Sequence, residues 1–131
     1  MAQSKRILVV DDETRVLFIL GAALKSMPSG IEVTEASNGR QALERLATEH
    51  FDLIITDLFM PEVDGIELTE AVRQLDPNVP VVWITARGCY RVHDQSERLQ
   101  VYRCLDKPLR VGQIRQIARQ ALATAGQAQE P

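Results

Sequence analysis

Apolar and polar positions along this chain follow two different periods. Short apolar runs rich in β-branched residues are typical of strands that are buried on both faces of a sheet. Between these runs, apolar residues recur every three or four positions, as they do on the buried side of a helix. The runs predict five strands, at residues 6–10, 31–36, 53–57, 79–85 and 101–105.

The helical spacing predicts one helix after each strand. The first covers residues 14–27 and the last about residues 111–123, whereas residues 87–100 have a weak pattern that predicts a loop and a poorly specified helix. Asn38 and Asp64 are predicted N-caps, each followed three residues later by Gln or Glu as in a capping box. The residues predicted to face the core are Leu17, Leu20, Leu24 and Met27; Leu43, Leu46 and Ala47; Leu68, Ala71, Val72 and Leu75; and Val111, Ile114, Ile117, Ala121 and Leu122.

Alternating strands and helices predict an α/β fold. Five strands with a helix after each require a parallel sheet that is covered by helices on both faces, with right-handed crossovers. A chain of 131 residues is long enough to bury a core of its own and fits one domain. We therefore expect a single α/β domain with a five-stranded parallel sheet.

The overall composition is that of a soluble globular protein. Hydrophobic residues make up 45% of the chain and charged residues 25%. No apolar run approaches the ~20 residues that span a bilayer, and the apolar run after residues 1–6 is too short for a signal peptide. We expect a cytoplasmic protein without a membrane partner.

The two cysteines carry no sign of a metal or redox site. Cys89 and Cys104 lack the CxxC spacing, and no pair of histidines lies near them. The sequence therefore predicts two ordinary reduced thiols, as expected in a reducing compartment.

Charge is unevenly distributed along the chain. Residues 1–85 carry 7 basic and 14 acidic side chains, a net charge of −7, whereas residues 86–131 carry 8 basic and 4 acidic side chains, a net charge of +4. This asymmetry fits a solvated surface, and it also fits a basic face at residues 87–119 that docks an output domain or a partner protein. A nucleic-acid-binding motif is missing, so we do not expect direct binding to nucleic acid.

Polar side chains follow four of the predicted strands. Asp11 and Asp12 end the first strand, Asp57 the third, Thr85 the fourth and Lys107 the fifth. Because the carboxyl ends of parallel strands meet at one edge of the sheet, these residues are expected to lie together there. Any one of them alone would be interpreted as a helix cap or a turn residue. Together they indicate a site, because capping requires neither a lysine nor a threonine facing three carboxylates.

Three carboxylates at one point need positive charge nearby. Two carboxylates about 4 Å apart repel each other by roughly 4 kcal/mol at an effective dielectric constant near 20. Lys107 is one possible counter-charge, and a divalent cation with oxygen ligands, Mg²⁺ above all, is the other. A carboxylate, a hydroxyl, an ammonium and Mg²⁺ are the groups that phosphoryl transfer requires. Asp57 is then the expected nucleophile.

These motifs resemble a known family. Asp11-Asp12, the run from residue 56 to residue 65, Thr85-Ala86 and Lys107-Pro108 are similar to the motifs of the receiver domain of two-component response regulators. The resemblance implies a flavodoxin-like, CheY-like fold with strand order 2-1-3-4-5 over residues 5–124. Residues 125–131 are then a polar tail or the start of a linker.

The resemblance also implies roles for the site residues. Asp57 is expected to accept a phosphoryl group from the phosphohistidine of a sensor histidine kinase or a phosphotransfer protein. The residues implied to hold Mg²⁺ are Asp12, Asp57 and the backbone carbonyl of Phe59, with Asp11 acting through water. Thr85, the Ala86 amide and Lys107 would contact the phosphoryl oxygens, and the Lys107–Pro108 peptide bond would be cis.

The implied function is switching rather than turnover of a separate substrate. The domain would catalyse only its own phosphorylation and dephosphorylation, so it is not an enzyme in the ordinary sense. Phosphorylation would switch its interactions with an output domain or partner protein, with a homodimer as one possible form. Two alternatives remain open: a receiver-like module that binds partners without phosphorylation, and a flavin-binding protein, which would need a phosphate-cradling loop where this chain has Asp11-Asp12-Glu13.

The chain departs from the family at three places. Position 104, commonly a Tyr or Phe that acts as an aromatic switch, is a cysteine. The positions two residues beyond the acceptor and the threonine, which tune dephosphorylation, are Phe59 and Arg87, and Phe59 cannot orient an attacking water. Residues 88–100 lack the small-residue pattern of the family's fourth helix, and His93 within them is predicted to be a surface residue.

Overall fold

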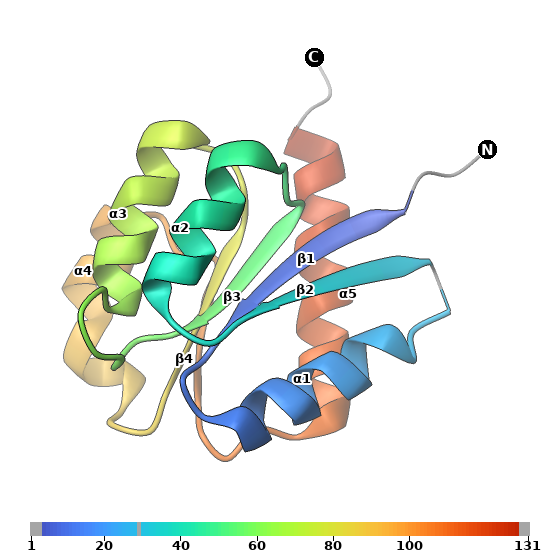
Figure 1. Cartoon of the computed structure of the whole chain (residues 1–131), viewed down its shortest axis with the longest axis horizontal. Helices are drawn as coiled ribbons and strands as arrows, with labels where there is room; N and C mark the ends of the chain where they lie inside the picture. Colours follow the sequence, from blue (N-terminus) through green and yellow to red (C-terminus); the bar gives the residue numbers. More distant parts are fainter. Residues whose placement is uncertain (1–3, 29, 129–131) are drawn as a thin grey trace.

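The predicted strands form one parallel sheet between two layers of helices (Figure 1). The computed structural model describes residues 4–28 and 30–128. The strands are β1 (Lys5–Val10), β2 (Ile31–Ala36), β3 (Leu53–Asp57), β4 (Val81–Thr85) and β5 (Arg103–Asp106), in the order β2-β1-β3-β4-β5. The predicted fold class and strand order are confirmed.

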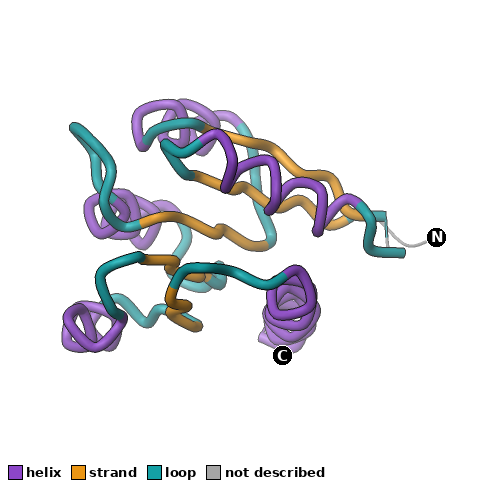
Figure 2. The backbone as a smooth tube through the Cα atoms, turned by 90° about the horizontal axis from the view of Figure 1, so that it is seen from below, coloured by secondary structure: helices purple, strands orange, loops and turns teal. Residues whose placement is uncertain are grey.

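The helices divide between the two faces of this sheet. They are α1 (Thr14–Lys25), α2 (Gly39–Thr48), α3 (Gly65–Leu75), α4 (His93–Arg98) and α5 (Val111–Ala128), with a 3₁₀ turn, η1 (Cys89–Val92), before α4. Figure 1 shows α1 and α5 on one face and α2 and α3 on the other, and the end-on view in Figure 2 shows the strands lying between helices. None of the helices in the described ranges has the length and hydropathy of a membrane span.

Two apolar clusters fill the space between the sheet and its helices. Successive residues of a strand point to opposite faces, so Ile7 and Val9 pack under α1 and α5, whereas Leu8 and Val10 pack under α2 and α3. Strands β3 and β4 are buried along their whole length. Burial on both faces explains why these strands are continuous apolar runs rather than alternating ones.

Most of the predicted core positions are buried, four are half-buried (Leu43, Leu46, Ala71 and Leu122) and three are exposed. Ala47 is exposed, since five helical residues place it about 140° around α2 from the buried Ala42. Leu75 is 63% exposed at the last residue of α3, and Val111 is 42% exposed at the first residue of α5. Both residues are the terminal residues of their helices, where the helical period alone does not imply burial.

The predicted helix starts are confirmed. Asp64 accepts a hydrogen bond from the Glu67 backbone N–H at 2.8 Å, and the Glu67 carboxylate accepts one from the Asp64 N–H at 3.0 Å, which completes a capping box. Asn38 accepts from the Gln41 N–H at 2.8 Å. The Gln41 side chain, however, accepts from Ser37 instead of closing a second capping box.

The last elements differ slightly from the predicted ranges. Strand β5 begins at Arg103, two residues later than predicted, and α5 continues to Ala128 rather than ending near residue 123. The weak pattern of residues 87–100 corresponds to η1 and the short α4, as predicted. Residues 129–131, the end of the predicted tail, lie outside the described residues.

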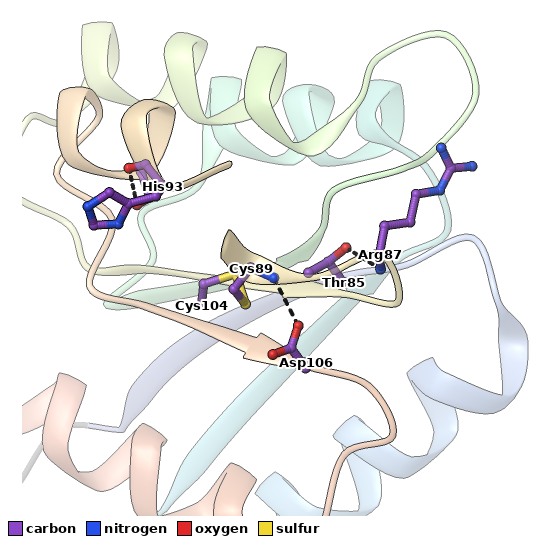
Figure 3. The surroundings of a disulfide bond; sticks show 7 residues. Thr85, Arg87, Cys89, His93, Cys104 and Asp106 are labelled. Carbon is purple, nitrogen blue, oxygen red and sulfur yellow. Dashed lines mark hydrogen bonds between the residues drawn. A yellow bond between two sulfur atoms is a disulfide. The ribbon is translucent and has the colours of Figure 1, made fainter. Parts of the chain in front are cut away.

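The prediction of two reduced thiols is wrong. Cys89 and Cys104 form a disulfide, with Cα atoms 5.8 Å apart and a sequence separation of 15 (Figure 3). This Cα distance lies within the usual range for a disulfide. The pairing carries no sequence motif, because β5 lies beside β4 only in the folded sheet and thereby brings position 104 next to the turn that follows β4.

A buried hydrogen-bond chain joins β4 to α3. The Trp83 indole N–H donates to the Thr69 hydroxyl at 2.8 Å, and that hydroxyl donates to the Gly65 carbonyl at 2.7 Å. Trp83 and Thr69 are fully buried. A buried donor without a partner costs stability, so Thr69 is the residue that allows an indole to sit in this apolar layer.

We expect Thr69→Val to lower the free energy of unfolding by about 2 kcal/mol, because it leaves the Trp83 N–H without this acceptor. Thr69→Ser is the matched control: it keeps the hydroxyl and loses only one methyl group, worth about 1 kcal/mol. Urea unfolding followed by Trp83 fluorescence measures both values. A valine variant at least as stable as the serine variant would contradict this role for Thr69.

Candidate functional site

Three carboxylates meet at the carboxyl edge of the sheet. Asp11 and Asp12 directly follow β1, and Asp57 is the last residue of the neighbouring strand β3. One carboxylate oxygen of each lies within 4.8 Å of the others. Asp11 and Asp57 are buried, at 0% and 4% exposure, whereas Asp12 is exposed. The fold thus assembles the predicted acidic cluster.

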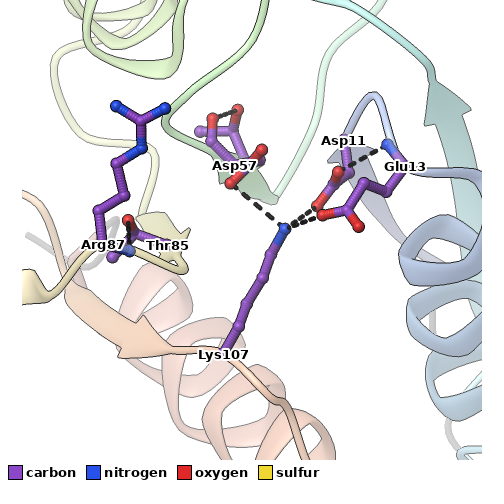
Figure 4. A network of polar contacts seen from close by, with 7 residues as sticks. Asp11, Glu13, Asp57, Thr85, Arg87 and Lys107 are labelled. Atoms are coloured by element: carbon purple, nitrogen blue, oxygen red, sulfur yellow. Dashed lines mark hydrogen bonds and ion pairs between the residues drawn. The ribbon is translucent and has the colours of Figure 1, made fainter.

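Lys107 provides the nearest positive charge to this cluster (Figure 4). Its Nζ lies 3.0 Å from Asp11 Oδ2, 3.5 Å from Asp57 Oδ1 and 2.8 Å from Glu13 Oε1. The Lys107 backbone N–H donates to the Thr85 carbonyl at 2.8 Å, which fixes the start of its side chain beside β4. The predicted contact between this lysine and the carboxylates is confirmed.

Glu13 is a partner of Lys107 that the sequence reasoning missed. It lies just before α1 and accepts a hydrogen bond from the lysine ammonium, which lowers the pKa of the Glu13 carboxyl. The available signal was its position directly after Asp11-Asp12, which makes three successive acids at one strand end. Glu13 is largely exposed, so its ion pair with Lys107 is the one most open to competition by another anion.

Burial and like charge make ionised Asp57 unfavourable. Desolvation raises the pKa of Asp57 to about 6, with the neighbouring Asp11 carboxylate acting in the same direction, while Lys107 and the Leu58 backbone N–H act against it. Desolvation also raises the pKa of Asp11, although the Glu13 backbone N–H donates to its Oδ1 at 2.8 Å. The site therefore has a shortage of positive charge.

Lys107 is held in its charged form. Burial alone would lower the pKa of this ammonium, but the hydrogen bond to Glu13 and the charges of Asp11 and Asp57 outweigh burial and raise it. One ammonium is then shared among three carboxylates. It does not outweigh the burial of Asp57 and the charge of Asp11, so the pKa of Asp57 remains raised.

The acidic cluster fits a hard divalent cation. Asp11 Oδ2 is buried and accepts no hydrogen bond of acceptable geometry within the described ranges, although Lys107 Nζ lies 3.0 Å from it. A buried carboxylate oxygen with spare acceptor capacity is what an ion or its bound water would use. All the donors in this cluster are oxygens, which favours Mg²⁺ or Ca²⁺ over softer metals.

Thr85 and Ala86 lie at the same edge of the sheet. Thr85 is the last residue of β4 and is fully buried, and its hydroxyl accepts a hydrogen bond from the Arg87 N–H at 3.0 Å. Ala86 is exposed. Within the described part of the chain, the Thr85 hydroxyl is bonded in its own turn and makes no hydrogen bond to Asp57 or Lys107, so the fold places it near the carboxylates without joining it to them.

Phe59 and Arg87 form a stacked pair next to the acidic cluster. The Arg87 guanidinium lies 4.3 Å from the centroid of the Phe59 ring. These are the two positions at which the sequence departs from the family near the acceptor and the threonine. The stack places an apolar ring two residues beyond Asp57, and neither of its side chains can accept a proton from an attacking water.

The start of α3 packs tightly against the end of β3. The Gly65 N–H donates to the Leu58 carbonyl at 2.9 Å, and a Cβ on Gly65 would overlap the Asp57 carbonyl oxygen and come within 2.8 Å of the Leu58 Cα. Only glycine permits this approach. Backbone contacts therefore join the two ends of the loop between Asp57 and α3 to each other.

The predicted basic face is partly used within the molecule. Arg98 pairs with Glu70 at 3.2 Å, and Arg115 donates to the Ala23 carbonyl at 3.1 Å. Arg87 and Arg91 remain exposed, on the segment between β4 and α4. His93 is also exposed, with Nε2 3.5 Å from Glu97, so its prediction as a surface residue is confirmed.

The Lys107–Pro108 peptide bond is cis, as the resemblance implies.

The profile of the family described as "Response regulator receiver domain" matches residues 7–119 of the chain. The chain belongs to this family. The match spans the acidic cluster, Thr85 and Lys107, so all the predicted site residues lie inside the receiver domain.

Similar proteins include receivers that stand alone and receivers within longer chains. The chain is 36% identical over 104 residues to the response regulator receiver protein CpdR of Brucella abortus, covering 79% of this chain and 85% of CpdR. It is 36% identical over 103 residues to the sensor protein EvgS of Escherichia coli O157:H7, covering 79% of this chain but only 8% of EvgS. A CheY-like receiver domain structure from Methanospirillum hungatei has a TM-score of 0.89 at 25% identity, covering 96% and 99% of the two chains.

We expect Asp57→Asn to raise the free energy of unfolding at pH 7 by about 1–3 kcal/mol, because it removes a carboxylate whose ionised form is unfavourable in the folded receiver. Asp12→Asn is the matched control, since it removes an exposed charge of the same cluster and should change stability little. Urea unfolding in metal-free buffer measures both. If Asp57→Asn lowers the free energy of unfolding, the ionised Asp57 carboxylate is not unfavourable in the folded protein.

Proposed function

We propose that this receiver accepts a phosphoryl group on Asp57 from the phosphohistidine of a sensor histidine kinase or a phosphotransfer protein. The observation that carries this is the buried Asp57 carboxylate at the end of β3, with Lys107 and two further acids around it. An Asp57 oxygen attacks phosphorus, the P–N bond of the phosphohistidine breaks, and the imidazole leaves. Mg²⁺ would neutralise the phosphoryl oxygens during this transfer.

The receiver residues then have separate roles. We assign Mg²⁺ binding to Asp12, Asp57 and the Phe59 backbone carbonyl, with Asp11 acting through water. The Thr85 hydroxyl, the Ala86 backbone amide and the Lys107 ammonium would contact the phosphoryl oxygens. Lys107 already lies 3.5 Å from Asp57, and a phosphoryl group there would draw it from the exposed Glu13, whose screened ion pair is the weakest of its three.

The receiver would act on itself and not on a separate small substrate. We propose that it catalyses only its own phosphorylation and dephosphorylation, in the cytoplasm. Its phosphorylation would switch binding of an output domain or partner protein, or formation of a homodimer, on the face of residues 87–119, where Arg87 and Arg91 are exposed. No direct contact with nucleic acid is proposed.

Two other functions have less support. A module that binds partners without phosphorylation would not need an intact acidic cluster with a lysine, and both are present. A flavin phosphate would have to bind beside Asp11, Asp12 and Glu13 after β1, where three acids would repel it.

We expect a small-molecule phosphodonor to label the wild-type protein in Mg²⁺ and not in a chelator, because the donor is anionic and meets uncompensated carboxylates. Asp57→Ala should remove the label, whereas Asp94→Ala, an exposed carboxylate in α4, should keep it. Intact-protein mass spectrometry measures the added phosphoryl group. Full labelling of the Asp57→Ala variant would sink the assignment.

We expect Phe59→Asn to shorten the lifetime of the phosphoryl group by roughly tenfold, equivalent to about 1.4 kcal/mol of barrier, because an amide can orient a water where the ring cannot. Phe59→Leu is the control: it stays apolar but loses the stack with Arg87. If both variants lose phosphate at the same rate, the lack of a water-orienting side chain at position 59 is not what slows dephosphorylation.

A further inference from the structure

The disulfide lies between the site and the face that would be read by a partner. Cys89 is the first residue of η1, four positions after Thr85, and Cys104 is the second residue of β5 (Figure 3). Cys104 pairs in register with Trp83 of β4 and packs against the apolar cluster under α2 and α3. The disulfide therefore occupies the position at which the family commonly has a switching aromatic residue.

The short turn after β4 is anchored at both of its ends. At the site end, the Thr85 hydroxyl accepts from the Arg87 N–H at 3.0 Å. At the other end, the Cys89 N–H donates to Asp106 Oδ1 of β5 at 2.9 Å, beside the disulfide to Cys104. If Thr85 moves toward a phosphoryl group, the turn that follows it must move as well, and this turn is covalently attached to β5.

The ring closed by this disulfide contains the whole of α4. Residues 90–103 lie between the two cysteines, and the described α4 residues include none that is fully buried. At the far end of the helix, the Arg73 guanidinium donates to the Leu99 and Gln100 carbonyls at 2.8 and 3.1 Å. With that end fixed by Arg73, the disulfide is the covalent restraint on the near end.

We propose that Cys89 and Cys104 are a reversible redox site that sets whether the phosphorylation state of Asp57 reaches the surface of α4 and β5. In the oxidised form the turn is attached to β5 and α4 is held. In the reduced form the turn can follow Thr85. The phosphorylation half of this proposal rests on the proposed function, whereas the redox half uses only the proposed cytoplasmic location.

The chemistry is a two-electron thiol–disulfide exchange. A dithiol reductant attacks one sulfur of the Cys89–Cys104 bond, forms a mixed disulfide and is released as its own disulfide, leaving two thiols on the receiver. In the other direction, a disulfide of the glutathione class takes two electrons and two protons from the thiols. Both cysteines are partly exposed, so a small reductant can reach them. Disulfides in reducing compartments are mostly transient or redox-sensing, so the cytoplasmic location proposed above favours reversibility.

The first experiment tests the redox site without any phosphoryl group. The wild-type protein is equilibrated in glutathione buffers of different ratios, and alkylation with mass spectrometry counts the free thiols. Amide hydrogen exchange is then measured over residues 86–103. We expect no alkylated thiol in the oxidised form and two in the reduced form, with exchange in this segment about tenfold faster after reduction and unchanged in α2.

Cys89→Ser is the matched variant, and it should exchange like the reduced wild type in both buffers. Cys104→Ser should do the same from the other side of the bond, so the test does not depend on the folding of a single variant. A disulfide that never forms in oxidising glutathione would overturn the proposal. So would exchange over residues 86–103 that is equal in the two redox forms.

The second experiment adds beryllofluoride as a phosphoryl mimic to both redox forms, with Asp57→Ala as the control. We expect the mimic to change exchange over residues 86–103 in the reduced wild type and in Cys89→Ser, and to change it much less in the oxidised protein. An equal response in both forms would overturn the coupling. If the reduced protein does not respond although the phosphodonor labels Asp57, the coupling fails while the phosphoacceptor function stands; if Asp57 is not labelled either, the phosphoacceptor function fails, and in both cases the redox site is judged by the first experiment alone.

Discussion

The chemistry of this receiver depends on an excess of negative charge at one edge of the sheet. Asp11, Asp12 and Asp57 come together there because β1 and β3 are neighbours in a parallel sheet, and among the described residues Lys107 pairs with two of them, Asp11 and Asp57. The two buried carboxylates, Asp11 and Asp57, cost stability in their ionised form. That cost makes the edge receptive to a cation, and together with a cation it can receive a phosphoryl group.

The apolar layers keep this charged edge in place. Trp83 fills the space between β4 and α3, and its N–H reaches the Thr69 hydroxyl, which in turn bonds to Gly65. Gly65 closes directly on the Asp57 carbonyl, so packing deep in the core fixes the backbone at the acceptor. A rigid acceptor leaves the turn after β4, which begins at Thr85, as the part that can move.

Beside that turn, in β5, this receiver departs from the pattern of its family. A cysteine replaces the commonly aromatic residue at position 104, and it is joined to Cys89 rather than left free to change rotamer. The exposed Arg87 and Arg91 follow on the same segment. The proposed switch would therefore make the segment after β4 respond both to the phosphorylation state of Asp57 and to the redox state of Cys89 and Cys104.

The sequence by itself determined the fold class, the strand positions, the helix caps and the identity of the acidic cluster. Local periodicity and proline, glycine and cap residues act over a few positions, and parallel strands must end at a common edge, so these features were readable without a structure. Tertiary structure alone decided the disulfide between Cys89 and Cys104, the pairing of Glu13 with Lys107 and the exposure of Leu75 and Val111. Each of these depends on which residues from distant segments become neighbours, and this is not encoded in a local pattern.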